Sequence, residues 1–292
     1  MSIGCDSQHQ ATGIIKGRMM WFVKILLYLV CAYLLFLVIT FFVQRRLLYL
    51  PDRRMPSRMH IQTSGLRFWP AGDRAHRGFI GPEQKTAYSG TVIVFHGNAG
   101  AAWNRDFYIE KLEPLGFRVV LAEYPGYGGR SGKMSERNFL TDAKTTVRLV
   151  YEKYGKPIFL CGESLGCGVT TGVVADSPVS IQGLILITPW DSLPELAQTI
   201  YWYLPARRLV LDKYDNIRNV RGYRGPVAVI LAEHDEIVPR RHGMRLYEAL
   251  AAPKKLWVLK GESHNTWPRM SDGSWWRETM EFIARDNTNS LE

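Results

Sequence analysis

The hydrophobic positions divide the chain into two parts with different patterns. Residues 19–43 read "MMWFVKILLYLVCAYLLFLVITFFV", with Lys24 as the only charge. As a helix rising about 1.5 Å per residue, the uncharged run 25–43 spans nearly the whole hydrocarbon core of a bilayer. The run is long for a signal peptide, and "FFVQRRLL" offers no small-x-small cleavage site. Because bulky Val30 precedes Cys31, a lipoprotein site is also disfavoured. We predict an uncleaved, single transmembrane helix.

The basic residues around this helix predict its orientation. Lys16 and Arg18 precede it, and a larger set follows it: Arg45, Arg46, Arg53, Arg54 and Arg58. Positive residues concentrate on the cytoplasmic side of membrane proteins. The sequence therefore predicts a single-pass membrane protein whose following domain is cytoplasmic, although the difference is small and the opposite orientation stays open.

From Thr91 onward, short apolar runs alternate with segments of helical spacing. We read "TVIVF", "FRVVLAEY", "PIFLCG", "IQGLILITPW", "VAVILAEHD" and "KLWVLKGES" as strands, with segments such as "SERNFLTDAKTTVRLVYEKY" as helices between them. Ser135 is a plausible cap for that helix. Near-continuous apolar strands alternating with helices predict an α/β fold, with a mostly parallel central sheet flanked by helices. Ligands of such sheets bind beyond the carboxyl ends of the strands.

Composition narrows the class of protein. The chain is 46% apolar and 22% charged, as in an ordinary globular protein. The net charge of +10 is compatible with binding to nucleic acid. However, no stretch interleaves basic residues with stacking aromatics as nucleic-acid-binding modules do. The four cysteines are not spaced as metal ligands, and we read them as buried free thiols. We therefore expect no metal and no nucleic-acid partner.

A serine stands where one predicted strand meets the next helix, in "GESLG". Such a G-x-S-x-G sequence is weak evidence by itself, but its position is informative. In a sharp strand-to-helix turn, Ser164 adopts a sparsely populated backbone conformation that exposes its hydroxyl. Side chains at Gly162 and Gly166 would collide in that turn. The alternative is a glycine-rich helix start with serine as its N-cap.

A serine nucleophile needs a base, and the base needs an acid. His264 follows the last predicted strand, where a returning loop reaches Ser164. Asp235 ends the strand before it and is our first choice for the acid, with Glu236 and Asp191 as competitors. The other histidines lie before the apolar helix, in early strands, in a helix or in other motifs.

The same edge of the sheet also provides donors for an oxyanion. The backbone N–H of Leu165 lies at the positive end of a helix. The loop "HGNAG" after "TVIVF" offers a second N–H from Asn98 or Ala99. We interpret His96 in this loop as a residue that stabilises the loop and not as a base.

Five motifs occur in one chain in register with the strands: "FHGNAG", "EYPGYGGRSG", "GESLG", "AEHDEIVP" and "GESHN". They resemble the α/β-hydrolase superfamily and, more narrowly, its membrane-anchored Bem-like proteins, over residues 48–285. The resemblance implies an α/β-hydrolase fold, a triad of Ser164, Asp235 and His264, and no cofactor. It also places Tyr124 in a loop near the site, where it would line the pocket.

These readings predict the organisation of the chain. Residues 1–18 are a tail, 19–43 the transmembrane helix, 44–60 a basic linker, 61–286 the α/β-hydrolase domain and 287–292 a C-terminal tail. The lid that many relatives insert is short here, at about 191–226. Its aromatic residues Tyr201, Trp202 and Tyr203 form an apolar flap over the pocket or, alternatively, pack onto the core.

Residues and resemblance together predict a membrane-tethered serine hydrolase that cleaves carboxylic esters or thioesters. Its expected partners are the lipid bilayer and a small acyl ester or thioester, with acyl lipids or acyl proteins as substrates. The alternatives are a non-catalytic membrane scaffold or receptor on a hydrolase fold, and a peptidase of the prolyl-oligopeptidase-like lineage.

Overall fold

Eight strands form one sheet in the computed structural model, which describes residues 6–70, 75–82, 87–270 and 273–285. The strand order is β10-β9-β8-β7-β4-β6-β3-β2. The six strands from β10 to β6 run parallel, and β3 runs antiparallel to both of its neighbours, β6 and β2. Their bounds are β2 Arg67–Trp69, β3 Gly78–Ile80, β4 Gly90–Phe95, β6 Phe117–Ala122, β7 Ile158–Glu163, β8 Gly183–Ile187, β9 Val227–Ala232 and β10 Lys254–Leu259. The mostly parallel sheet predicted from the sequence is confirmed.

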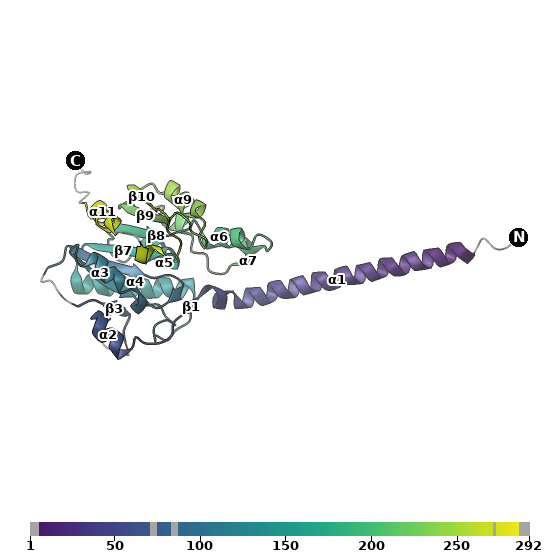
Figure 1. The fold of residues 1–292 in the computed structure, drawn as a ribbon, viewed down its shortest axis with the longest axis horizontal. Coiled ribbons are helices and arrows are strands. Elements are labelled where there is room, and N and C mark those ends of the chain that lie inside the picture. The colour runs from purple at the N-terminus through teal and green to yellow at the C-terminus, as the bar shows by residue number, and fades with distance from the viewer. Residues whose placement is uncertain (1–5, 71–74, 83–86, 271–272, 286–292) are drawn as a thin grey trace. The chain divides into compact units, whose positions relative to one another are not determined.

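Helices cover both faces of this sheet (Figure 1). One face carries α4 (Glu136–Tyr154), α5 (Leu165–Val174), α6 (Leu193–Ile200) and α9 (Arg240–Ala249). The other carries α3 (Phe107–Leu112), α10 (Trp267–Met270) and α11 (Ser274–Ile283). Short helices α2 (Arg58–Ser64), η1 (Ala102–Arg105), α7 (Ala206–Leu209) and α8 (Asn216–Asn219) lie in the connections. The hydroxyl of Ser135 accepts a hydrogen bond from Asn138 N and caps α4, as predicted.

The alternation of side chains along each strand explains the two layers of helices. In β4, Ile93 and Phe95 pack on the α4 and α5 side, whereas Val92 and Val94 pack on the α3 and α11 side. Successive residues of a strand point to opposite faces. A run of uniformly apolar residues is therefore stable only where both faces are covered.

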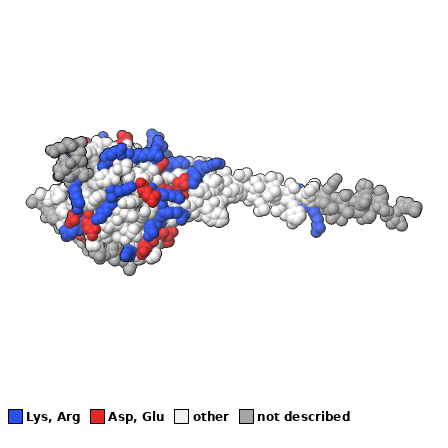
Figure 2. Space-filling model, turned by 90° about the horizontal axis from the view of Figure 1, so that it is seen from above, with Lys and Arg blue, Asp and Glu red and all other residues white. Residues whose placement is uncertain are grey.

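The chain forms two compact units, Met1–Gln44 and Arg45–Glu292. Most of the first unit is helix α1, which runs from Asp6 to Leu48. Within it, Arg18–Leu48 forms a stretch of 31 residues that is long and apolar enough to cross a membrane. Figure 2 shows few charged side chains on the described part of this helix, while Lys and Arg are spread over the second unit with Asp and Glu among them. The helix extends beyond the predicted 19–43 at both ends.

The sequence predicts that residues 44–60 are a linker, but from Arg45 onward this segment is built into the second unit. Arg45 pairs with Asp212 at 2.9 Å, and Tyr49 is buried. Strand β1 (Leu50–Pro51) pairs in parallel with β5 (Ala99–Gly100). Arginines and prolines are typical of a linker, but their partners here lie far away in the sequence. The predicted tail at 287–292 lies outside the described residues.

Glycine at position 166 is required by the packing of α5 against the end of β4. A Cβ there would lie 1.8 Å from Phe95 O and 2.9 Å from His96 O. Backbone atoms cannot move aside as a flexible side chain does, so we expect Gly166→Ala to reduce the free energy of unfolding by about 3 kcal/mol or more. Chemical denaturation of the full chain in detergent micelles measures this change.

Gly222→Ala is the matched control, because no atom lies within 4 Å of a Cβ at that position. We expect this variant to unfold like the wild type. Equal stability of the two variants would contradict the packing argument.

Candidate active site

The three predicted triad residues meet at the carboxyl edge of the parallel sheet. Ser164 follows β7, Asp235 follows β9 and His264 follows β10. Because these strands are parallel and belong to one sheet, their carboxyl ends share an edge. The fold thereby brings together side chains that are up to 100 positions apart in the sequence.

Ser164 occupies the strained turn between β7 and α5. Its backbone has φ 52° and ψ −111°, a conformation that side-chain-bearing residues rarely adopt. A Cβ on Gly162 would lie 2.6 Å from Gly166 O, and one on Gly166 would enter the β4 backbone. The collision expected from the sequence is therefore confirmed at both glycines, and the turn depends on them.

A chain of hydrogen bonds runs from the serine to the aspartate. His264 Nε2 lies 3.1 Å from Ser164 Oγ, and His264 Nδ1 lies 2.8 Å from Asp235 Oδ2. Asp235 Oδ1 also accepts hydrogen bonds from the backbone N–H groups of Ile237 and Val238, which hold the carboxylate in place. With the proton on Nδ1, the imidazole donates to Asp235 and its Nε2 accepts from the serine hydroxyl. Such an arrangement can make the hydroxyl nucleophilic toward an acyl carbon.

The competitors for the acid have other partners. Glu236 accepts from the backbone N–H of His264 at 3.3 Å rather than from its ring. Asp191 contacts His242 Nδ1 at 2.8 Å and Arg245 at 3.2 Å. Burial alone would raise the pKa of Asp191, but hydrogen bonds from His242 and its other donors hold that pKa below its usual value. The carboxylate that faces the ring of His264 is therefore Asp235.

The loop expected to offer an oxyanion donor is held by the segment that follows α1. Asn98 O accepts from Leu50 N at 3.0 Å and from the hydroxyl of Tyr127 at 2.8 Å. The side-chain amide of Asn98 donates to Leu48 O at 3.0 Å. Ala99 of β5 pairs with Leu50 of β1. Leu165 begins α5 directly after Ser164, so its N–H lies at the helix N-terminus.

His96 braces this loop from within the core, as the sequence indicates. Its Nε2 lies 2.9 Å from Glu123 Oε1, and its Nδ1 lies 2.8 Å from Gly97 O. Glu123 Oε2 also accepts from Ala102 N at 2.9 Å. Both His96 and Glu123 are almost completely buried. The ring therefore links the end of β4 to the end of β6 and does not reach Ser164 as a base.

The sequence did not predict a mostly buried ion pair next to the turn, whose side chains are 18% and 13% exposed. Glu163, the residue before Ser164, accepts from Arg105 at 2.8 Å and 3.0 Å. Burial alone would raise the pKa of Glu163, but the guanidinium of Arg105 holds that pKa below its usual value. Nothing in the spacing of the motif links Glu163 to Arg105, which lies 58 positions away.

Tyr124 does not lie where the resemblance places it. Tyr124 is buried, stacks on Phe139 at 4.5 Å and donates its hydroxyl proton to His96 O at 2.8 Å. It therefore supports the loop from the core and does not line a pocket. Tyr201, Trp202 and Tyr203 follow α6 and are exposed, so they do not pack onto the core.

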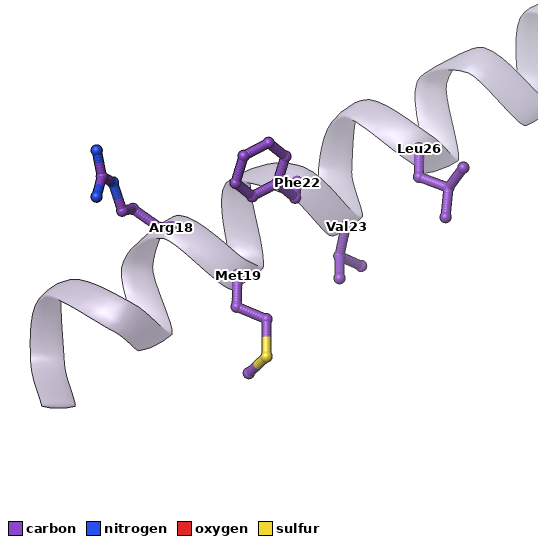
Figure 3. A pocket seen from close by; sticks show the side chains of 5 residues that line it. All are labelled: Arg18, Met19, Phe22, Val23 and Leu26. Carbon is purple, nitrogen blue, oxygen red and sulfur yellow. The ribbon is translucent and has the colours of Figure 1, made fainter.

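Ser164 and His264 are themselves nearly covered, with 7% and 8% of their surfaces exposed. A separate apolar hollow lies along one face of α1, lined by Arg18, Met19, Phe22, Val23 and Leu26 (Figure 3). It consists of the spaces between side chains of a single helix, so it encloses no ligand site. Among the residues that the structure describes, no group of three His, Cys, Asp or Glu residues is placed to hold a metal ion.

Comparison with known proteins agrees with this architecture. Residues 86–214 match the family model described as serine aminopeptidase, S33. The chain is 35% identical over 248 residues to an uncharacterized protein of Mycobacterium tuberculosis, covering 83% of this chain and 86% of that protein. It is 32% identical over 184 residues to the lysophosphatidylserine lipase ABHD12 of Danio rerio, covering 56% of this chain and 48% of that lipase. The chain thus matches about half the length of that lipase.

Solved structures share the fold. An esterase of Pyrococcus furiosus superposes with a TM-score of 0.64 at 17% identity, covering 82% of this chain and 98% of the esterase. A monoacylglycerol lipase of Paleococcus ferrophilus superposes with a TM-score of 0.54 at 22% identity, covering 68% of this chain and 95% of the lipase.

Removing one partner of the Arg105–Glu163 pair leaves a charge buried without compensation. We expect Arg105→Leu to lower the free energy of unfolding by about 3 kcal/mol, because breaking a buried pair is costly. The double variant Arg105→Leu/Glu163→Gln should recover part of this loss. Denaturant titrations at pH 7 measure both changes, and equal stability of the single and double variants would contradict the pairing.

The same pair predicts a pH dependence. Because the folded-state pKa of Glu163 is lowered, its stabilising contribution is present above the unfolded value of about 4.3 and is lost as pH falls through the folded pKa. We expect the difference in unfolding free energy between wild type and Glu163→Gln to shrink below about pH 4.3. A difference that stays constant to lower pH would argue against an ionised Glu163.

Proposed function

The chain belongs to the α/β-hydrolase superfamily, and from that premise we propose that it is a membrane-tethered serine hydrolase acting on acyl esters or thioesters. The observation that carries this proposal is the chain of hydrogen bonds from Ser164 Oγ through His264 to Asp235. The strained turn at Ser164 supports it independently, because backbone strain of this kind concentrates at functional sites.

In the proposed acylation step, Ser164 Oγ attacks the acyl carbon and its proton passes to His264 Nε2. The carbonyl oxygen becomes an oxyanion, which the N–H groups of Leu165 and of Asn98 or Ala99 would hold. One such donor contributes about 3–4 kcal/mol to the stability of the transition state. Asp235 stabilises the imidazolium that forms. The intermediate then collapses, the alcohol or thiol leaves with the proton from His264, and Ser164 remains acylated.

In the deacylation step, His264 takes a proton from water as the water attacks the acyl carbon. The second tetrahedral intermediate uses the same N–H donors. Its collapse releases the carboxylic acid and returns the proton to Ser164 Oγ. No cofactor enters either step.

The substrate class follows from the expected location. The apolar stretch Arg18–Leu48 supports a single-pass anchor, and the arginines after it favour a cytoplasmic domain. An enzyme tethered beside a bilayer meets acyl lipids and acylated proteins. The similarity to lysophosphatidylserine lipases favours single-chain acyl phospholipids among these substrates.

A peptidase is the second candidate, because the matching family model is described as a serine aminopeptidase. Parallel assays with a p-nitrophenyl ester and an aminoacyl p-nitroanilide distinguish the two. Faster turnover of the ester supports the lipase proposal, and faster turnover of the anilide supports the peptidase.

We expect Ser164→Ala to lower the turnover of a p-nitrophenyl ester by about a millionfold, since the nucleophile is lost. The same substitution should abolish labelling by a fluorophosphonate probe. Ser89→Ala, which changes an exposed serine, is the control and should behave like the wild type. Wild-type protein that is folded yet neither labelled nor active would favour a non-catalytic scaffold or receptor.

A further inference from the structure

We propose that the segment 200–211, here called the 200–211 surface, is a second membrane contact that lies in the headgroup region of an anionic bilayer. This inference rests on the proposed membrane tether, and it adds a surface that the tether does not require. Its occupant is the bilayer itself, with anionic phospholipid headgroups as the ligands of its arginines.

Large apolar side chains are concentrated at this surface. Tyr201, Trp202 and Tyr203 are 46%, 78% and 55% exposed, and Ile200 and Leu211 are each 43% exposed. These five exposed residues lie within twelve positions, and the rings of Trp202 and Tyr203 contact each other at 5.8 Å between centroids, so water solvates this apolar surface poorly. Tyrosine and tryptophan are the residues enriched at membrane interfaces, because their rings are apolar and carry a polar group.

The loop holds these aromatics outward in a defined conformation. Leu204 and Ala206 are buried and anchor its inner side. The amide of Gln198 donates to Leu204 O at 2.9 Å and accepts from Arg207 N at 3.2 Å. Exposure of the aromatic rings is therefore imposed by an ordered loop.

Charge complementarity identifies the kind of membrane. Arg207 and Arg208 are exposed in α7, directly after the aromatics, and Lys213 is exposed just beyond the segment. Arg207 also pairs with Glu195 at 2.6 Å, and both side chains of that pair are solvent-accessible. Each basic residue near an anionic leaflet contributes about 1 kcal/mol to binding. Aromatic rings flanked by arginines match a bilayer that contains anionic lipid.

The covalent connection of the chain brings this surface toward the bilayer. Arg45 Nε and Nη2 donate to the two oxygens of Asp212, each at 2.9 Å, and the Tyr49 hydroxyl donates to Asp212 at 2.9 Å. Asp212 is the residue directly after Leu211. Arg45 comes two residues after the apolar run ends at Val43, a rise of about 3 Å in a helix. If that run spans the hydrocarbon core, the end of the 200–211 surface is held at the membrane boundary.

Two readouts on the full chain in lipid nanodiscs test the proposal. The first readout is the difference in tryptophan fluorescence between wild type and Trp202→Phe. This difference signal reports Trp202 alone. In nanodiscs of phosphatidylcholine and phosphatidylglycerol, we expect brominated acyl chains to quench this difference signal. Quenching does not depend on catalysis, so it tests the contact even if the proposed activity is absent.

The second readout compares two substrates in the triple variant Tyr201→Ser/Trp202→Ser/Tyr203→Ser. We expect hydrolysis of a long-chain monoacyl phospholipid in the nanodisc to fall about tenfold more than hydrolysis of water-soluble p-nitrophenyl acetate. Tyr151→Ser, which changes an exposed tyrosine on α4, is the matched control and should leave both rates unchanged. Arg207→Gln/Arg208→Gln should reduce the dependence of the lipid rate on phosphatidylglycerol.

An unquenched difference signal would overturn the proposal, as would equal loss of both activities in the triple variant. Two chains in each nanodisc without quenching would indicate that a dimer shields Trp202. That result would assign the surface to a second copy of the chain and would also overturn the proposal. Failure of the proposed function has a different signature, which is a wild-type chain that turns over neither substrate while the quenching is retained.

Discussion

The backbone at Ser164 is the constraint from which the arrangement of the site follows. Its positive φ is tolerated because glycines stand two residues away on either side, and a Cβ on either of them would meet backbone atoms. The turn directs Oγ away from the sheet while α5 starts immediately afterwards. Asp235 and His264 lie three and five residues after the ends of β9 and β10, and these strands end at the same edge as β7, so both side chains reach the hydroxyl. A small strained unit therefore organises side chains from three distant parts of the chain.

Charged groups beneath this unit are consistently paired. Glu163 faces Arg105, Glu123 faces His96, and Asp191 faces His242 and Arg245. Isolated carboxylates are costly to bury, and each of these is compensated by a partner from a different element. The pairs join β7 to η1, the end of β4 to the end of β6, and the loop after β8 to α9. In this way these contacts connect the loops at the carboxyl edge on which the site is built.

Local patterns in the sequence were sufficient to predict the strands, the meeting of Ser164, Asp235 and His264 at one edge of the sheet, and the requirement for glycine around Ser164. The reason is that each depends on neighbouring residues: apolar runs define strands, and a motif at a strand end fixes its place at the sheet edge. Tyr124 was misplaced because its orientation depends on Phe139 and on His96 O, which belong to other segments. The 44–60 segment was misread for the same reason, since Pro51 and Arg45 have partners about 50 and 167 positions away. Long-range pairs of this kind leave no periodic signal in a single sequence.

The pairing of β1 with β5 has a practical consequence for handling the protein without its apolar helix. The peptide groups of residues 48–52 supply the acceptor for the Asn98 amide and the donors to Asn98 O and Gly100 O. A shortened chain that starts at Arg45 keeps these contacts, whereas one that starts at Arg53 leaves the loop beside Ser164 without its neighbouring strand. Removing eight further residues would thus separate a shortened chain whose loop keeps its neighbouring strand from one in which Ser164 is intact but the backbone beside it has lost its support.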